Sequence, residues 1–155
     1  MMKNRMEYEK MYTVARWTLL LVALVSAVNL VWILIDKSFN FIATAAIPEV
    51  LTLVEIALYS LKAPLFWQIV CIAVTAAVLI FYFLCWQFAK AKPRWMLIGG
   101  IVYLVDYAFR LYLLGMDLLG GRDDLVMILL RVLIPTVALV TVIRGLIARA
   151  KLKTQ

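Results

Sequence analysis

No histidine occurs among the 155 residues of the chain. Histidine is the commonest general base and metal ligand near neutral pH, so its absence excludes serine–histidine and cysteine–histidine nucleophile pairs. The two cysteines, Cys71 and Cys85, lie in one apolar stretch and would be about 21 Å apart along a helix, which is beyond disulfide reach. We expect them to act as small apolar residues. A glycine-rich phosphate loop is also missing, and the sequence therefore predicts neither an enzyme nor a cofactor or metal site.

Charged residues are scarce as well, at 16% of the chain, whereas apolar residues make up 66% and the mean hydropathy is +1.00. Soluble globular chains contain roughly 45–50% apolar residues. A chain this short has too little interior to hide such an excess from water, so lipid must be its solvent. The net charge of +7 does not indicate a nucleic-acid partner, because most basic residues flank long apolar runs, where they act as topological anchors.

Four apolar runs are long enough to cross the roughly 30 Å hydrocarbon layer, which takes about 20 helical residues. They cover residues 17–35, 65–89, 95–116 and 125–147, within a single membrane domain spanning 1–155. The first run is read as a retained anchor, since its apolar region is longer than that of a cleaved signal peptide. The expected fold is therefore an all-α membrane protein with four transmembrane helices.

The stretch 41–61 is also long enough to cross, and the distribution of basic residues decides against it. If this stretch does not cross, the N-terminus, the 90–94 turn and the C-terminus share one side, which collects eleven of the sixteen lysines and arginines. The opposite side has Lys37, Lys62 and Arg122. If the stretch crosses, eight basic residues lie on one side and six on the other, and the bias nearly disappears. Because cytoplasmic loops carry the positive excess, we expect both termini inside and four spans.

The sequence predicts that residues 47–61 form a non-crossing amphipathic helix on the outer side. Pro48 suits a first helical turn and Glu49 complements the positive end of the helix dipole. Polar residues then recur at spacings of three or four, in one stripe that includes Glu55. Two positions remain open: the helix lies in the outer interface with its stripe toward water, or it dips into the bilayer and turns the stripe toward the bundle.

Charged and polar residues inside the spans predict a buried cluster. Asp106 and Arg110 are four residues apart and share a helix face. Asn29, Arg110 and Arg131 all lie about 10 Å below the outer ends of their spans, where an antiparallel bundle would bring them together. Unpaired charges at this depth cost roughly 2.5–3.5 kcal/mol on insertion scales, which favours their meeting. The members of the predicted cluster are Asn29, Glu55, Tyr103, Asp106, Arg110 and Arg131.

Two interpretations of this cluster stay open. It is either interhelical glue or an outward-open polar pocket, capped by Glu55, for an anionic or zwitterionic solute or an acidic peptide. Asp123 and Asp124, in the turn before the last span, fall well short of the six or more oxygen ligands of a calcium site and are read as solvated loop charge.

The arrangement resembles small four-helix bacterial membrane proteins of uncharacterised families. The resemblance rests on the basic start, the tryptophan-led first span, Ala45-Ala46-Ile47-Pro48 and Val105-Asp106-Tyr107. It implies a multi-pass protein of the bacterial plasma membrane and carries no functional residue over. The function expected first is a binding or accessory protein of the immunity or stress type. The alternatives are a small homo-oligomeric transporter or channel, and a structural subunit of a larger membrane complex.

Overall fold

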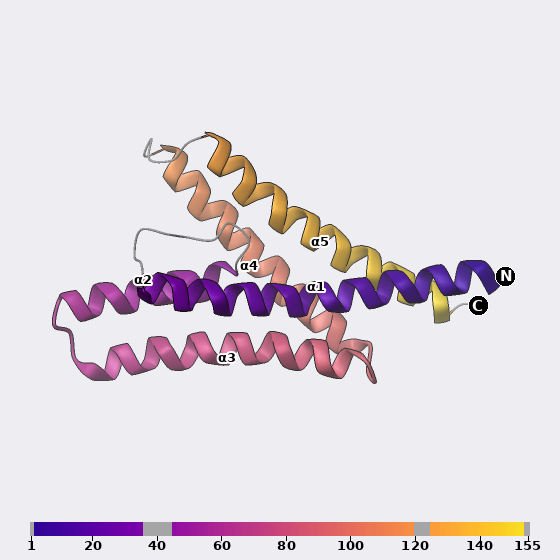
Figure 1. Cartoon of the computed structure of the whole chain (residues 1–155), viewed down its shortest axis with the longest axis horizontal. Helices are drawn as coiled ribbons and strands as arrows, with labels where there is room; N and C mark the ends of the chain where they lie inside the picture. Colours follow the sequence, from indigo (N-terminus) through magenta and orange to yellow (C-terminus); the bar gives the residue numbers. More distant parts are fainter. Residues whose placement is uncertain (1, 36–44, 120–124, 154–155) are drawn as a thin grey trace.

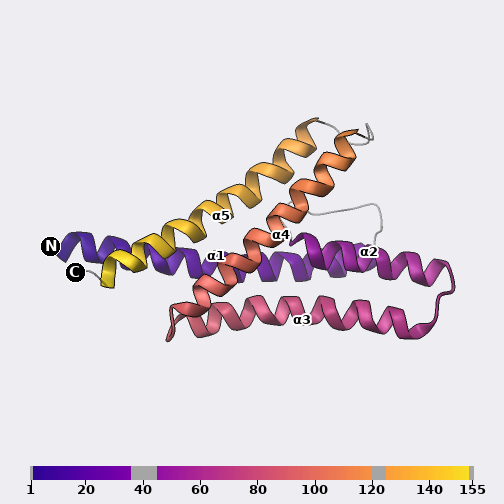
Figure 2. The same ribbon diagram turned by 180° about the vertical axis from the view of Figure 1, so that it is seen from behind.

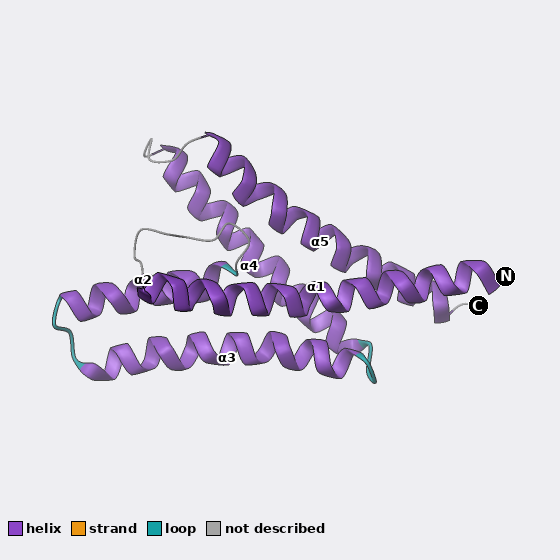
Figure 3. Cartoon of the chain, viewed as in Figure 1, coloured by secondary structure: helices purple, strands orange, loops and turns teal. Residues whose placement is uncertain are grey.

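The computed structural model describes residues 2–35, 45–119 and 125–153. These residues form five helices and no strand (Figures 1 and 3). In chain order the helices are α1 (Met2–Ile35), α2 (Ala46–Ser60), α3 (Leu65–Ala89), α4 (Arg94–Leu119) and α5 (Leu125–Lys153). Lys37, Arg122, Asp123 and Asp124 lie outside the described residues.

Four of these helices are long and apolar enough to cross a membrane. The qualifying segments are Arg5–Ile33, Leu65–Ala89, Arg94–Met116 and Leu129–Leu152. This confirms the all-helical class and the four long apolar helices predicted from the sequence. Helix α2 has only 15 residues, about 22 Å of helix, and is too short to cross.

Burial in this fold is reversed relative to a soluble protein. Large apolar side chains such as Ile35, Leu61 and Leu65 are more than two-thirds exposed, whereas Asn29 and Asp106 are almost completely buried. A soluble fold would leave such polar side chains in water and hide the aliphatic residues. The pattern fits lipid around the helices and polar contacts between them.

The helices form two groups that diverge toward one end. Helices α1, α2 and α3 lie roughly along one direction, and α4 and α5 lean away from them (Figures 1 and 2). Helix α5 packs against α1 near the two chain termini, which lie at the same end of the molecule. There Gly145 allows close approach, because a Cβ atom on it would collide with the Ala15 side chain. The groups are thus joined at the end that carries the termini and separate at the other end.

Helix α2 turns back sharply into α3, and the two helices pack side by side in opposite directions. Lys62 has φ 53°, in the left-handed region. Its N–H bonds the Tyr59 carbonyl at 3.1 Å, and the Ala63 N–H bonds the Leu58 carbonyl at 2.9 Å. This is a Schellman ending, which satisfies carbonyl groups that the helix end would otherwise leave open. It fixes the far end of α2 against α3.

The other end of α2 lies deep between the helices. Ala45 precedes the helix and its N–H bonds the Ser26 hydroxyl, nine residues before the end of α1. Nine helical residues span about 14 Å, so α2 begins about that far from the end of α1, measured along the α1 axis. On α4 the neighbouring contact is Asp106, which is close to the middle of that helix. Helix α2 therefore starts near mid-length of α4 and nine residues before the end of α1, and it runs toward the diverging end.

Candidate functional site

The first turn of α2 depends on acceptors from other helices. Its N-cap residue is Ala45, which has no side-chain acceptor. Three successive backbone N–H groups instead donate across helices, each at 2.8 Å: Ala45 to Ser26 Oγ on α1, and Ala46 and Ile47 to Asp106 Oδ2 and Oδ1 on α4. Asp106 thus performs, from another helix, the function of an N-cap side chain.

This contact combines two favourable electrostatic terms. Asp106 is 1% exposed, and each of its carboxylate oxygens accepts one backbone N–H. Hydrogen bonds to an ionised group contribute roughly 1.5–3 kcal/mol each, about twice a neutral one. The positive end of the helix dipole adds to the stabilisation of the buried carboxylate. The contact stabilises both a buried charge and a buried helix terminus, each of which would be costly alone.

A second link joins the same two helices one turn farther along. Arg110 Nη2 donates to Glu49 Oε2 at 3.0 Å, with side chains that are 7% and 14% exposed. Glu49 lies one turn after Ala46 on α2, and Arg110 lies one turn after Asp106 on α4. The two links therefore follow the same helix faces in register. Together they hold α2 against α4 where the bundle begins to open.

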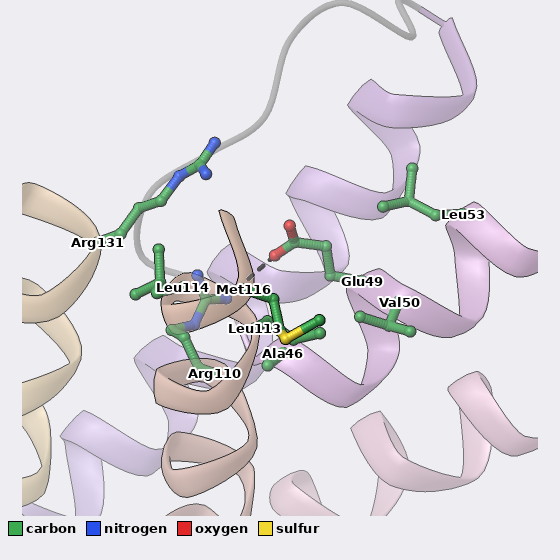
Figure 4. A pocket seen from close by; sticks show the side chains of 9 residues that line it. All are labelled: Ala46, Glu49, Val50, Leu53, Arg110, Leu113, Leu114, Met116 and Arg131. Carbon is green, nitrogen blue, oxygen red and sulfur yellow. Dashed lines mark hydrogen bonds and ion pairs between the residues drawn. The ribbon is translucent and has the colours of Figure 1, made fainter. Parts of the chain in front are cut away.

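Next to this ion pair is a pocket of about 250 Å³ between α2, α4 and α5 (Figure 4). Arg110 and Glu49 border it, and Arg131 contributes a second guanidinium group from α5. In Figure 4 the Arg131 and Glu49 side chains extend into the space between α5 and α2. The other described residues of its wall are apolar: Ala46, Val50, Leu53, Leu113, Leu114 and Met116.

Beneath the pocket, α4 is fastened to α5 by two tyrosines. The Tyr103 hydroxyl donates to the Pro135 carbonyl at 3.3 Å. The hydroxyls of Tyr107 and Thr136 are 2.6 Å apart. Tyr103 also packs edge-to-face against Tyr82 of α3, with ring centroids 6.4 Å apart. These contacts position α4 and α5, and hence Arg110 and Arg131, relative to each other.

The structure divides the predicted polar cluster into separate parts. Only Arg110 and Arg131 border the pocket. Asn29, Tyr103 and Asp106 are buried and do not belong to the described wall of this pocket. The physical reason is that Asp106 is engaged by backbone N–H groups and Tyr103 by the Pro135 carbonyl.

Glu55 is the predicted cap of the cluster, and the described pocket wall contains a different glutamate. Glu55 is half-buried and is not part of the pocket wall, where the carboxylate belongs to Glu49. Glu55 lies six residues, nearly two turns, beyond Glu49 and closer to the α3 turn. Glu49 was predicted to start the polar stripe and to complement the dipole of its own helix, and its ion pair with Arg110 depends on how α2 packs against α4.

Sequence reasoning also missed Ser26 and the backbone N–H groups of α2. One signal could have pointed to them: the residue before Ala46-Ile47-Pro48 is alanine, although helices usually begin with an acceptor side chain. A helix in an apolar setting without its own cap needs an acceptor from elsewhere. Within the described parts of the chain, no group of three histidine, cysteine, aspartate or glutamate residues could hold a metal ion.

Comparisons of the chain with family models, with curated proteins and with solved structures found no match.

Replacing Asp106 should show how much its two hydrogen bonds to α2 contribute to stability. Asp106→Asn keeps one carbonyl acceptor, so we expect a loss of about 1–2 kcal/mol of unfolding free energy, and a larger loss for Asp106→Ala. Ser26→Ala, which removes one neutral bond, should cost about 1 kcal/mol. Thermal unfolding in a neutral detergent can be followed with a thiol-reactive fluorophore, because Cys71 and Cys85 are buried and react on unfolding. Equal stability of Asp106→Ala and Ser26→Ala would contradict the capping function of Asp106.

The Glu49–Arg110 pair should show strong energetic coupling. Removing one partner of a buried ion pair costs roughly 3–5 kcal/mol, because the other charge stays buried without compensation. The double variant Glu49→Gln/Arg110→Gln should therefore lose less unfolding free energy than the sum of the losses in the two single variants. The exposed i,i+4 pair Arg5–Glu9, at 3.5 Å, is the matched control, with a coupling of about 0.3–0.5 kcal/mol. Equal coupling for the two pairs would be evidence against the buried ion pair.

Proposed function

We propose that the chain is a multi-pass protein of the bacterial plasma membrane with both termini on the cytoplasmic side. The basic residues of the N-terminus, the 90–94 turn and the C-terminus support this orientation. The two termini also lie at the same end of the bundle. In this orientation the diverging end of the two helix groups, with the pocket, belongs to the outer half of the bilayer.

In the same proposal α2 is a re-entrant half-helix and not a helix lying flat on the interface. Its first residues bond Ser26 and Asp106, about 14 Å in from the end of α1 and near mid-length of α4. A buried helix terminus inside a membrane requires protein acceptors for its N–H groups, and these residues supply them. Its polar residue Glu49 then faces the bundle and pairs with Arg110.

We further propose that the protein is a membrane binding protein of the accessory type, which takes the anionic group of a ligand from the outer half of the bilayer. The pocket next to the Glu49–Arg110 pair carries this proposal, because its described wall has two guanidinium groups and one carboxylate. Arginine donates from a planar fork that matches carboxylate and phosphate groups, so two guanidinium groups on one pocket wall favour an anionic ligand.

The polar residues around the pocket differ in what they contact. Asp106 and the Glu49–Arg110 pair hold α2 in place and account for a structural function. Arg131 comes from α5, opposite α2 across the pocket. Arg131 is therefore the residue whose replacement should change ligand binding with the smallest effect on the position of α2.

The orientation predicts the labelling of single cysteines. In a Cys71→Ala/Cys85→Ala background, Ser60→Cys at the end of α2 should react with a membrane-impermeant maleimide added to intact cells. Lys92→Cys, in the turn between α3 and α4, should react only after the membrane is permeabilised. Both native residues are exposed, so the difference reports the side of the membrane and not burial. The reverse pattern would contradict the proposed orientation.

Anion binding predicts stabilisation that depends on Arg131. Dodecyl phosphate and glycerol 3-phosphate carry the same charged group, and at least one of them should raise the unfolding temperature of the wild type, because a ligand that binds only the folded state stabilises it. The shift should be lost in Arg131→Gln and partly retained in Arg131→Lys. Arg144→Gln, on the same helix but exposed at the terminal end, is the matched control and should keep the full shift. An equal shift in Arg131→Gln and wild type would refute the proposed function.

A further inference from the structure

At the end that carries the termini, the chain extends past the rest of the bundle. The first part of α1 and the last part of α5 run beyond the turn between α3 and α4 (Figures 1 and 2). We call these two segments, residues 2–16 and 144–153, the terminal stalk. They are joined by the close approach at Gly145 and by the Arg149 guanidinium group, which lies 5.4 Å from the centre of the Tyr12 ring. The terminal stalk is therefore one surface built by two helices.

Two tryptophans mark the level at which the membrane ends. Trp17 of α1 and Trp86 of α3 contact each other near the terminal stalk, with ring centroids 5.6 Å apart. Tryptophan is enriched at the boundary between a membrane and water. Met6 lies eleven residues beyond Trp17, about 16 Å along the helix, whereas the headgroup layer adds only about 5–8 Å on each side. In the proposed orientation, the far half of the terminal stalk therefore extends past the lipid into the cytoplasm.

One face of the terminal stalk has a groove on each side of a short stripe. The stripe consists of Met6, Lys10 and Val14, which follow one another at four-residue spacing on α1. A groove of about 400 Å³ lies between it and α5, and a second groove of about 420 Å³ lies on its other side. We call the stripe and its two grooves the stalk face. Met6 is 59% exposed and Val14 is 56% exposed, and exposed apolar side chains beside a groove are typical of a protein-interaction surface.

The terminal stalk also has an excess of positive charge. The groove between α1 and α5 is lined by Lys10 and Arg144 and by one carboxylate, that of Glu7. Lys10 and Arg144 make no hydrogen bond or ion pair with any described residue, whereas Glu9 pairs with Arg5 at 3.5 Å. Against these two glutamates, the terminal stalk has eight basic residues: Lys3, Arg5, Lys10, Arg16, Arg144, Arg149, Lys151 and Lys153. The stalk face therefore offers cations to an acidic partner, next to apolar side chains.

The composition of the stalk face decides which partner fits it. Acyl chains end before Met6, which lies beyond the headgroup layer. The phosphates of a nucleic acid would meet Glu7 and Glu9, each of which lines one of the grooves. A second copy of the chain has the same orientation in the membrane and brings the same positive excess, which is repulsive. An amphipathic segment of another protein matches the stalk face, because its aliphatic side chains fill the grooves and its carboxylates bond the basic residues.

We propose that the terminal stalk is the docking surface for a cytoplasmic protein, which binds it through an acidic amphipathic helix. The apolar side of that helix packs on Met6 and Val14, and its carboxylates bond Lys10 and Arg144. Methionine suits such a surface because its flexible side chain adapts to the residues packed on it. The inference goes beyond the proposed function, since the ligand pocket lies in the opposite half of the membrane.

The chemistry is tested with the full chain in phosphatidylcholine nanodiscs and with two defined peptides. One is a short helical peptide with leucine on one side and glutamate on the other, and the second has lysine in place of each glutamate. Fluorescence polarisation should show binding of the acidic peptide above the signal of empty nanodiscs, and no binding of the basic one. Lys10→Glu/Arg144→Glu should weaken binding of the acidic peptide on the order of tenfold or more, and Met6→Gln should weaken it several-fold.

Lys90→Glu/Lys92→Glu is the matched control, because it makes the same change in charge at two exposed residues of the 90–94 turn. It should leave binding unchanged. The thiol-reactivity assay verifies the folding of every variant, since Cys71 and Cys85 are buried in the folded chain.

A photo-crosslinking amino acid at Met6 of the full chain tests the inference in cells. The same amino acid at Arg5, which is exposed on the other side of α1, is the control. We expect one protein to be crosslinked from Met6 and not from Arg5, through an acidic amphipathic segment, and the crosslink to be lost in Lys10→Gln/Arg144→Gln. The inference is overturned if Met6 crosslinks lipid alone, if a DNA duplex or the basic peptide binds as well as the acidic peptide, or if the control double variant weakens binding equally.

Discussion

The arrangement of this bundle depends on one constraint: a helix that begins among other helices, away from water, needs acceptors for its first N–H groups. Helix α2 begins with alanine and cannot supply its own cap. Ser26 and Asp106 accept the three N–H groups instead. Because Asp106 and the α2 terminus each compensate the other, neither can be moved without leaving a buried charge or a buried open donor.

The Glu49–Arg110 pair follows from that first contact. Once Asp106 fixes the start of α2, the next turn of α2 faces the next turn of α4, and the two charges on these turns meet. Both residues of the pair border the pocket. A structural contact and a candidate binding site thus share the same two helix faces, and among the described residues of α5 Arg131 borders the pocket.

Charge compensation accounts for the buried carboxylates of the cluster. That of Asp106 is matched by a helix terminus and that of Glu49 by Arg110. Arg131 borders the pocket from α5, and ligand binding by this residue is part of the proposed function.

The sequence alone determined the four long apolar helices, because length and hydropathy are local properties and a bilayer selects for both. It also identified Asp106, Arg110 and Arg131 as the polar residues of interest, since charges inside apolar runs stand out without any structure. Only the tertiary structure decided their partners. Backbone N–H groups have no signature in the sequence, so the cap on α2 could not be predicted. Glu49 and Glu55 both belong to the polar stripe predicted from the sequence, and the depth at which α2 begins, set by Ser26 and Asp106, places Glu49 opposite Arg110.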